Sequence, residues 1–250
     1  MKQEKKDIII VGGGHAGIES ALIAKHLGKS VIIVTMDIRA VGRMSCNPAI
    51  GGLAKGQMVR EIDMLGGKMG VLADFSGIQF KVLNKKKGRA VWSPRAQVDK
   101  RAYESQAFRL LNDSGCQIVS GEVVSLTYKS NRVTGVKLRS GERLQSSSVI
   151  ITSGTFLSGL IHVGERKIRA GRMGEDRADG LTEHLESVGF LTGRLKTGTP
   201  PRLDRKSIDW RETSTVKGDK NPTPFSYLTS GFSPPNIPCH IAYTNNKAHG

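Results

Sequence analysis

One short segment near the start of the chain constrains the fold more than any other. Residues 7–11 form an apolar run (DIIIV), and the glycine-rich sequence GGGHAG follows at residues 12–17. Apolar residues then recur at helical spacing up to Leu27, Gly28 follows, and residues 30–34 form a second run rich in β-branched residues. Gly28 is typical of the position just after a helix. This order predicts a strand, a tight turn, a helix and a parallel strand, which is the βαβ unit of a Rossmann-like sheet.

The glycines of this turn fit the pattern G-x-G-x-x-G, in which each glycine has a mechanical role. Gly12 would make the tight turn, Gly14 would let the backbone approach a pyrophosphate, and Gly17 would pack the helix against the strand. The phosphates would then meet the positive end of the helix. The alternative is a glycine-rich turn that binds nothing. With both flanks in place, we predict a dinucleotide site whose first candidates are Gly12, Gly13, Gly14, His15, Ala16 and Gly17.

Two later features extend this predicted site. Asp37 lies 25 residues beyond Gly12, near the end of the second strand, where an acid usually binds the ribose hydroxyls; a solvated loop acid is the alternative. A later apolar run ends in Thr152-Ser-Gly154. In flavoproteins with a three-stranded excursion, a strand with this ending returns to the sheet beside the flavin. A plain strand-to-turn junction would explain the same residues, so the feature moderately favours a flavin over a nicotinamide cofactor.

The rest of the chain alternates between regular patterns and loops. We expect helices over residues 98–112 and 181–187, and strands near residues 116–128, 132–139, 143–152 and 190–195. Residues 41–70 are rich in glycine and only weakly periodic. Seven of the nine prolines lie at residue 200 or beyond. The predicted fold is α/β, with a parallel sheet, a small antiparallel β excursion in residues 1–200, and the beginning of a Pro-rich inserted domain in residues 201–250.

The loop MSCNPAIGG at residues 44–52 contains the most informative cysteine. Asn47 and Pro48 fit the N-cap and first position of a short helix. Helix-terminal N–H groups and the nearby Arg43 would both favour the reactive thiolate of Cys46. A small buried residue is the alternative. We assign no role to the other cysteines, because the wide spacing of Cys46, Cys116 and Cys239 argues against a disulfide framework, a zinc site or a disulfide reductase.

The charge of the chain favours a polyanionic partner. With 38 Lys and Arg against 22 Asp and Glu, the formal net charge is +16. Residues 81–101 hold eight basic residues and one acid, a net charge of +7, and Trp92 offers a stacking face there. A second basic segment, GRLKTGTPPR, spans residues 193–202. A solvated charge run and a surface turn are the alternatives. The candidate substrate contacts are Lys85, Lys86, Lys87, Arg89, Arg95, Arg194, Lys196 and Arg202.

Two general features bear on location. No apolar stretch approaches the roughly 20 residues that span a bilayer. The opening MKQEKKD leads into the first strand without a signal-peptide pattern. We therefore expect a cytoplasmic protein that does not bind membranes.

Five motifs occur in one order: GGGHAG, MSCNPAIGGLAKG, GIQFKVLNKKKGRAVWSPRAQVD, SGTFLSGLIHVG and GRLKTGTPPR. In this order the chain closely resembles the N-terminal part of the MnmG (GidA) family, the tRNA uridine 5-carboxymethylaminomethyl modification enzymes, over nearly its whole length. The resemblance implies a Rossmann-like FAD-binding domain and an enzyme that modifies the wobble uridine of tRNA together with the GTPase MnmE. It also implies NADH and methylenetetrahydrofolate as co-substrates, glycine or ammonium as the amine, and a homodimer.

The resemblance also assigns residues. Residues 12–17 match the FAD phosphate loop of the family, Val123 falls near the main chain that contacts adenine, and Cys46 matches the cysteine needed for activity. Ala178 stands where the family usually has a flavin-contacting Ser after the Gly-Arg-x-Gly turn, so that contact is made by the backbone or is lost. A second essential cysteine, a closing glycine-rich flavin motif and a helical C-terminal region have no counterpart. We therefore expect the FAD domain to be incomplete, and residues 1–250 alone to retain FAD weakly and to be inactive.

Two other functions compete with this one. The related FAD- and folate-dependent tRNA uridine C5 methyltransferase shares the flavin turn and part of the cysteine region, but the MSCNPAIGG and GRAVWSPRAQVD stretches favour the carboxymethylaminomethyl branch. A non-catalytic tRNA-binding remnant would be the better interpretation if the natural chain ended at Gly250.

Overall fold

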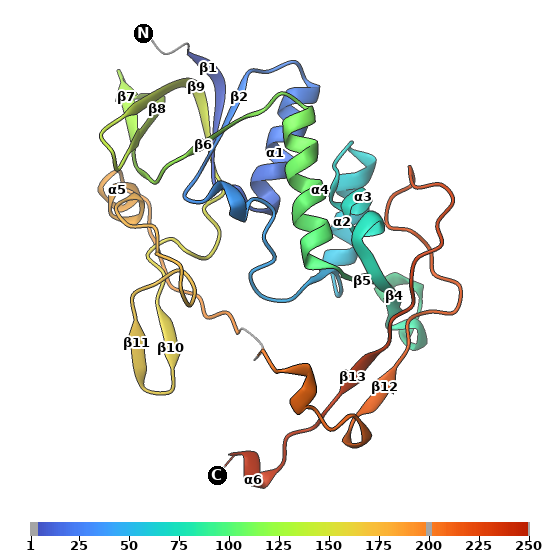
Figure 1. The fold of residues 1–250 in the computed structure, drawn as a ribbon. Coiled ribbons are helices and arrows are strands. Elements are labelled where there is room, and N and C mark those ends of the chain that lie inside the picture. The colour runs from blue at the N-terminus through green and yellow to red at the C-terminus, as the bar shows by residue number, and fades with distance from the viewer. Residues whose placement is uncertain (1–4, 199–201, 250) are drawn as a thin grey trace. The chain divides into compact units, whose positions relative to one another are not determined.

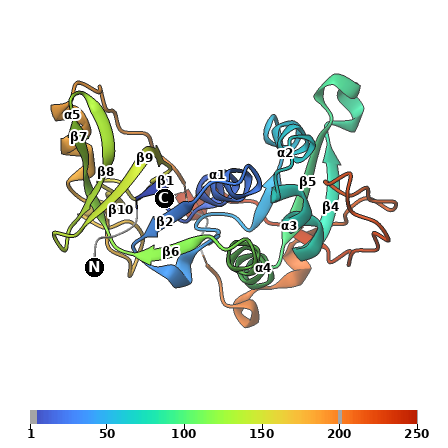
Figure 2. The same cartoon turned by 90° about the horizontal axis from the view of Figure 1, so that it is seen from above.

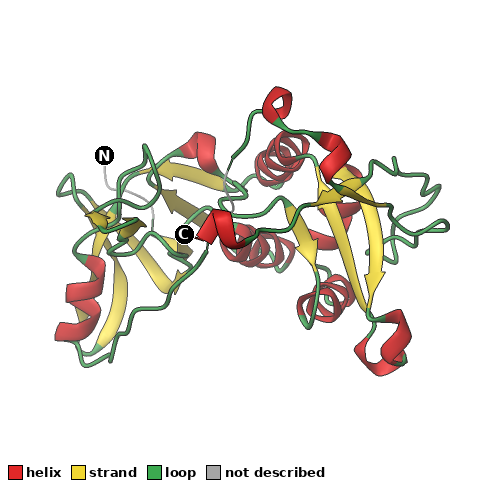
Figure 3. Cartoon of the chain, turned by 90° about the horizontal axis from the view of Figure 1, so that it is seen from below, coloured by secondary structure: helices red, strands yellow, loops and turns green. Residues whose placement is uncertain are grey.

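The structure is a computed structural model that describes residues 5–198 and 202–249 (Figure 1). The chain divides into two compact units, and each unit is built from two stretches of sequence. Unit 1 consists of residues 1–43 and 104–196, and unit 2 of residues 44–103 and 197–250. Long loops join many of the helices and strands (Figure 3).

Unit 1 is built on a six-stranded sheet with the strand order β6-β2-β1-β9-β8-β7. Strands β6, β2, β1 and β9 are parallel, whereas β8 and β7 continue the sheet in antiparallel fashion. The bounds of these strands are β1 Lys6–Val11, β2 Val31–Thr35, β6 Gln117–Ser120, β7 Val123–Lys129, β8 Arg132–Leu138 and β9 Arg143–Ile151. The predicted α/β class, with a parallel Rossmann-like sheet and an antiparallel excursion, is confirmed.

Helices cover this sheet because its central strands are apolar on both faces. Helix α1, His15–His26, packs against β1 and β2 (Figure 2), and α5, Leu181–Ser187, packs against β7. The core between these elements includes Ile9, Ile32, Val136 and Leu181, each at most 5% exposed. The unit also contains a two-stranded ribbon, β10 Ile161–Val163 and β11 Arg166–Ile168. Helix α4, Lys100–Asp113, begins in unit 2 and ends in unit 1.

Two predicted strands differ from the structure. The strand expected over residues 116–128 is two strands, β6 and β7, because Gly121 and Glu122 interrupt it and β7 turns to pair with β8. The strand expected near residues 190–195 does not form among the described residues. Residues 190–195 belong to no helix or strand, and Phe190, Leu191 and Leu195 are 62%, 102% and 96% exposed.

Unit 2 contains a three-stranded antiparallel sheet with the order β3-β5-β4, accompanied by helices α2 and α3. Its elements in residues 44–103 are β3 Ala49–Gly51, α2 Lys55–Met64, α3 Met69–Ser76, β4 Gly77–Leu83 and β5 Ser93–Val98. The weak periodicity of residues 41–70 concealed β3 and α2. Three short helical turns also form, η1 Ile38–Ala40 in unit 1 and η2 Lys85–Lys87 and η3 Arg89–Val91 in unit 2.

The Pro-rich tail packs onto this unit through buried contacts. Phe225 is 2% exposed. The carboxylate of Asp74 accepts hydrogen bonds from the main-chain N–H groups of Phe225 and Ser226 and from the hydroxyl of Thr229. Asp63 accepts another from the N–H of Tyr227 at 3.0 Å. The regular elements of the tail are η4 Arg205–Ser207, η5 Trp210–Glu212, β12 Ser214–Val216, β13 Cys239–Ile241 and α6 Asn246–His249.

The packing of the tail bears on the predicted domains. The predicted boundary between residues 200 and 201 lies outside the described residues and stays a prediction. The sequence did not indicate that residues 44–103 and the tail belong to one compact unit. None of the helices in the described part of the chain is long and apolar enough to cross a membrane.

Candidate functional site

The glycine turn lies at the carboxyl end of β1, in the middle of the parallel part of the sheet. Gly12 has a φ of +111°, and a Cβ added there would lie 2.4 Å from the carbonyl oxygen of Thr152. A Cβ added at Gly17 would lie 2.0 Å from the carbonyl oxygen of Gly12. Gly12 therefore makes the tight turn, and Gly17 allows α1 to pack closely against it.

The position of Gly14 differs from the other two. A Cβ added there would meet no atom within 4 Å, so the backbone borders open space at the start of α1. No side chain caps this helix, and its first turn contains no acidic residue. His15 is half-buried, and its loss of hydration lowers the pKa of the imidazole, which favours the neutral form. An uncapped helix N-terminus beside an open glycine fits a pyrophosphate group.

Thr152, at the end of β9, holds this turn in place. Its N–H donates to the carbonyl oxygen of Val11 at 2.8 Å, and its hydroxyl lies 2.9 Å from the same oxygen and 3.2 Å from that of Gly12. Gly154 has a φ of +64° and also borders open space. The predicted Thr-x-Gly ending thus lies directly beside the glycine turn, and the threonine hydroxyl positions the backbone of that turn.

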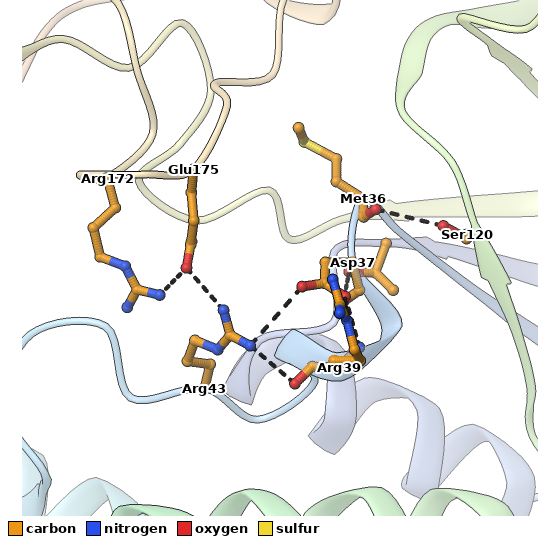
Figure 4. Close-up of polar contacts among 8 residues, drawn as sticks. Met36, Asp37, Arg39, Arg43, Ser120, Arg172 and Glu175 are labelled. Atoms are coloured by element: carbon orange, nitrogen blue, oxygen red, sulfur yellow. Dashed lines mark hydrogen bonds and ion pairs between the residues drawn. The ribbon is translucent and has the colours of Figure 1, made fainter.

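Asp37 lies two residues beyond the end of β2, on the same edge of the sheet. Its carboxylate accepts hydrogen bonds from the N–H of Arg39 at 2.9 Å and from its guanidinium at 3.1 Å, and this bonding lowers the pKa of Asp37. Arg43 lies 3.9 Å from Asp37 and donates to Glu175 at 2.8 Å, and Glu175 also pairs with Arg172 (Figure 4). Gly42, just before Arg43, donates its N–H to the carbonyl oxygen of Gly13 at 2.9 Å.

This network was missed by sequence reasoning. The partners Arg43 and Glu175 are 132 residues apart, and no local pattern connects them. Together with the bond from Gly42 to Gly13, it ties residues 172–175 and the loop after β2 to the glycine turn. Asp37 therefore lies where a ribose-binding acid is expected, with its carboxylate already engaged by arginine.

Val123 and Ala178 also lie in unit 1, and their main chains make defined contacts. Val123 begins β7 and is 4% exposed. Gly121, two residues earlier, donates to the carbonyl oxygen of Thr35 at 2.8 Å, which brings this segment beside the end of β2. The N–H of Ala178 donates to Phe156, and its carbonyl oxygen accepts from Ser158. The single N–H of Ala178 is therefore already used.

The helix cap predicted around Cys46 is wrong. Ala49–Gly51 is strand β3, which pairs with β5, and the next helix, α2, starts only at Lys55. The loop before a strand does not supply the helix-terminal N–H groups on which the argument for a thiolate depended. Arg43 does not supply that charge freely either, because its guanidinium pairs with Glu175.

Cys46 instead contacts Gly198 and Arg202 of the second basic segment, residues 193–202. Its half-buried thiol donates to the carbonyl oxygen of Gly198 at 3.0 Å. The guanidinium of Arg202 donates to the carbonyl oxygen of Cys46 at 2.9 Å. Two segments more than 150 residues apart are therefore joined at this cysteine.

The structure also bears on the other cysteines and on metal binding. Burial raises the pKa of the Cys116 thiol. Within the described ranges, no group of His, Cys, Asp and Glu could hold a metal ion.

The basic segment forms the tip of the β4–β5 hairpin in unit 2. Residues 85–92 are all exposed. Lys85 pairs with Asp219 at 2.9 Å, whereas Lys86 and Lys87 form no ion pair with any described residue. The guanidinium of Arg89 lies 5.7 Å from the centroid of the Trp92 ring, and the indole N–H donates to the carbonyl oxygen of Lys85. The tip is thus held by contacts among its own residues and by the Lys85–Asp219 ion pair, while Lys86 and Lys87 face solvent.

The remaining candidate cations lie outside the tip. Arg95 is a half-buried residue of β5. Arg194 donates to the carbonyl oxygen of Ser158 at 2.6 Å in unit 1, and Arg202 contacts Cys46 in unit 2. Lys196 is exposed. Part of the second basic segment, residues 199–201, lies outside the described residues.

A parallel sheet with a glycine turn at the centre of its carboxyl edge defines a Rossmann-like, nucleotide-binding class of fold. Within that class, the family model for glucose inhibited division protein A matches residues 7–250. The chain therefore belongs to this family.

Known relatives agree with this assignment. The chain is 47% identical over 247 residues to the tRNA uridine 5-carboxymethylaminomethyl modification enzyme MnmG of Aliarcobacter butzleri, covering 97% of this chain and 40% of that protein. It is 46% identical over 244 residues to MnmG of Karelsulcia muelleri, with the same coverage. Among solved structures, Aquifex aeolicus GidA superposes with a TM-score of 0.90 at 42% identity, covering 96% of this chain and 41% of that chain. The chain thus spans about 40% of the length of these relatives.

Proposed function

We propose that this chain belongs to a flavin-dependent enzyme that adds a carboxymethylaminomethyl or aminomethyl group to C5 of the wobble uridine of tRNA. The observation that carries this proposal is the family match over residues 7–250, together with MnmG relatives at 46–47% identity. The relatives are named as tRNA uridine modification enzymes, which supports tRNA as the substrate.

The glycine turn supports FAD as the cofactor. Residues 12–17 would hold the pyrophosphate, with Gly14 giving close approach and the N-terminus of α1 stabilising the negative charge. Asp37 would lie near the adenosine ribose, the main chain at Val123 near the adenine, and Thr152, Gly154 and Ala178 on the flavin side. Bound FAD would supply reversible two-electron transfer.

Cys46 is the proposed catalytic residue. Uracil C5 is a poor nucleophile, but addition of a thiolate at C6 forms a C6–S bond and places an electron pair on the enolate that includes C5. This carbon then attacks a one-carbon electrophile, and loss of the C5 proton with cleavage of the C6–S bond restores the ring and the thiolate. An acid/base role or carriage of the one-carbon unit would use the same thiol. In the structure the thiol donates to Gly198, so this contact must break before Cys46 can react.

The β4–β5 hairpin tip is the proposed contact for the tRNA backbone. Lys86, Lys87 and Arg89 are exposed cations within four residues, and such groups bind phosphates with little sequence preference. Trp92 has one face occupied by Arg89 and is 38% exposed, which leaves part of the ring for a base. Arg95, Arg194, Lys196 and Arg202 are the further candidate contacts.

The other components of the reaction follow from the family. NADH would reduce the flavin, methylenetetrahydrofolate would supply the carbon, and the GTPase MnmE would act as partner of a cytoplasmic homodimer. Because the chain spans about 40% of its relatives, we expect residues 1–250 alone to hold FAD weakly and to lack activity. Stoichiometric flavin absorbance from the purified 250-residue chain would contradict that expectation.

Mass spectrometry of tRNA nucleosides from a strain lacking this gene tests the proposal. The expected result is loss of the C5 side chain from the wobble uridine, with ribothymidine unchanged. Loss of ribothymidine alone would instead identify the tRNA uridine C5 methyltransferase. An unchanged nucleoside profile would leave only a non-catalytic role in tRNA binding.

A further inference from the structure

The β10–β11 ribbon of unit 1 is a basic surface that the proposed reaction does not use. Val163 pairs with Arg166 across a two-residue turn in which Gly164 has a φ of +57°. Residues 162–169 are all exposed, so the ribbon forms an arm rather than a part of the core. In Figure 1 the ribbon extends away from the six-stranded sheet of the same unit.

The charge of this arm is not neutralised. Arg166, Lys167 and Arg169 lie within four residues, and the one nearby acid is Glu165. None of these three cations forms an ion pair within the described part of the chain, whereas the next arginine, Arg172, is held by Glu175. The cations are therefore available to an external partner.

The register of the ribbon places cations on both of its faces. Cross-strand partners share a face, and successive pairs alternate between faces. Lys167 is opposite His162 on one face, and Arg166 is opposite Val163 on the other. Neither strand carries Phe, Tyr or Trp, so the small imidazole of His162 is the one ring of the arm that could stack on a base. Three exposed cations with so little ring surface suit the sugar-phosphate backbone rather than base recognition.

We propose that the β10–β11 ribbon is a second RNA-binding surface, which contacts the phosphate backbone of tRNA through Arg166, Lys167 and Arg169. This inference rests on the proposed function for the choice of tRNA as the polyanion. The site differs from the hairpin tip of unit 2 in its residues and in its lack of a Phe, Tyr or Trp ring.

Fluorescence anisotropy with labelled tRNA at a series of salt concentrations tests the inference. The test variant is Arg166→Gln/Lys167→Gln/Arg169→Gln. The matched control is Lys129→Gln/Arg132→Gln/Lys137→Gln, which removes three exposed cations from the β7–β8 hairpin of the same unit. Each phosphate contact contributes about 0.7 to 0.9 to the slope of log Kd against log salt, so three lost contacts should reduce the slope by about two. The control should keep the wild-type slope.

Each outcome decides the inference. A reduced slope in the ribbon variant alone supports it, provided that circular dichroism shows both variants folded as the wild type. The single variant Lys167→Glu should then also weaken binding. Equal slopes in the wild type and the ribbon variant overturn the inference and leave the proposed function intact. A wild-type protein that does not bind tRNA at low salt overturns the inference and also contradicts tRNA as the substrate.

Discussion

Replacement of Gly14 by alanine separates cofactor binding from folding. The backbone at Gly14 has φ −78° and ψ −173°, an extended conformation that alanine adopts readily, and its Cβ would meet no protein atom within 4 Å. Alanine is a weaker N-cap than glycine, which lowers stability, but it also restricts the unfolded chain, which raises stability. Because the two effects oppose each other, the free energy of unfolding should change by less than about 1 kcal/mol. If the pyrophosphate lies against Gly14, however, the new methyl group occupies its space.

The expected result is a Kd for FAD about 10- to 100-fold higher, which corresponds to about 1.4 to 2.8 kcal/mol. The assay is a titration of apoprotein with FAD, followed by flavin fluorescence, together with urea unfolding. Gly193→Ala is the matched control, because its added methyl also meets nothing within 4 Å but lies outside the turn. Gly17→Ala should instead destabilise the fold by about 1 to 3 kcal/mol, since its Cβ would lie 2.0 Å from Gly12. Wild-type FAD affinity in Gly14→Ala would refute the assigned phosphate position.

Three further predictions follow from single contacts. Thr152→Ala should weaken FAD binding about fivefold, because a hydrogen bond to the glycine turn worth about 1 kcal/mol is lost, and Thr152→Ser should restore the affinity. Equal FAD affinities for the two variants would be inconsistent with this role of the hydroxyl. Arg202→Gln should increase the rate at which N-ethylmaleimide alkylates Cys46 by about 3- to 10-fold, because the hydrogen bond to the Cys46 carbonyl oxygen is lost. The control variant Arg205→Gln should leave the rate unchanged. Peptide mapping measures both rates, and equal rates would show that Arg202 does not restrain this loop. The hydrogen bond from Arg139 holds the pKa of Glu122 below its usual value, so the ionised carboxylate stabilises the fold above its unfolded pKa, and this contribution is lost as pH falls through the lower folded pKa. In thermal unfolding between pH 3 and pH 7, the Glu122→Gln variant should therefore lose less stability toward acid than the wild type. Parallel curves of stability against pH for the two proteins would contradict the assignment.

The first βαβ unit was predictable because its signals are local. An apolar strand, a glycine turn and a helix that ends at a glycine lie within residues 6–28, and each is specified by its own sequence. The position of Thr152 beside the turn, and that of Asp37 beyond the end of β2 on the same edge of the sheet, also followed from sequence, since the carboxyl ends of parallel strands lie on one edge.

The errors share a different physical cause. Asn47 and Pro48 look like a helix start, but residues 49–51 pair with β5, more than 40 residues further along the chain. Helices α2 and α3 were not expected from the sequence, and part of their surroundings comes from the tail, because Asp63 of α2 and Asp74 of α3 accept hydrogen bonds from the main chain at Tyr227 and Phe225. The segment at residues 190–195 has a strand-like composition but pairs with no described strand. Long-range partners decided these elements, and a single sequence does not reveal such partners.

The decisive measurement is mass spectrometry of the wobble nucleoside after the gene is restored, as wild type or as Cys46→Ser, to the strain that lacks it. The wild-type gene should restore the C5 side chain and Cys46→Ser should not, although the variant protein accumulates and binds FAD as the wild type does. Full modification in the Cys46→Ser strain would contradict the role assigned to this cysteine, and an intact C5 side chain in the strain without the gene would contradict the proposed function itself.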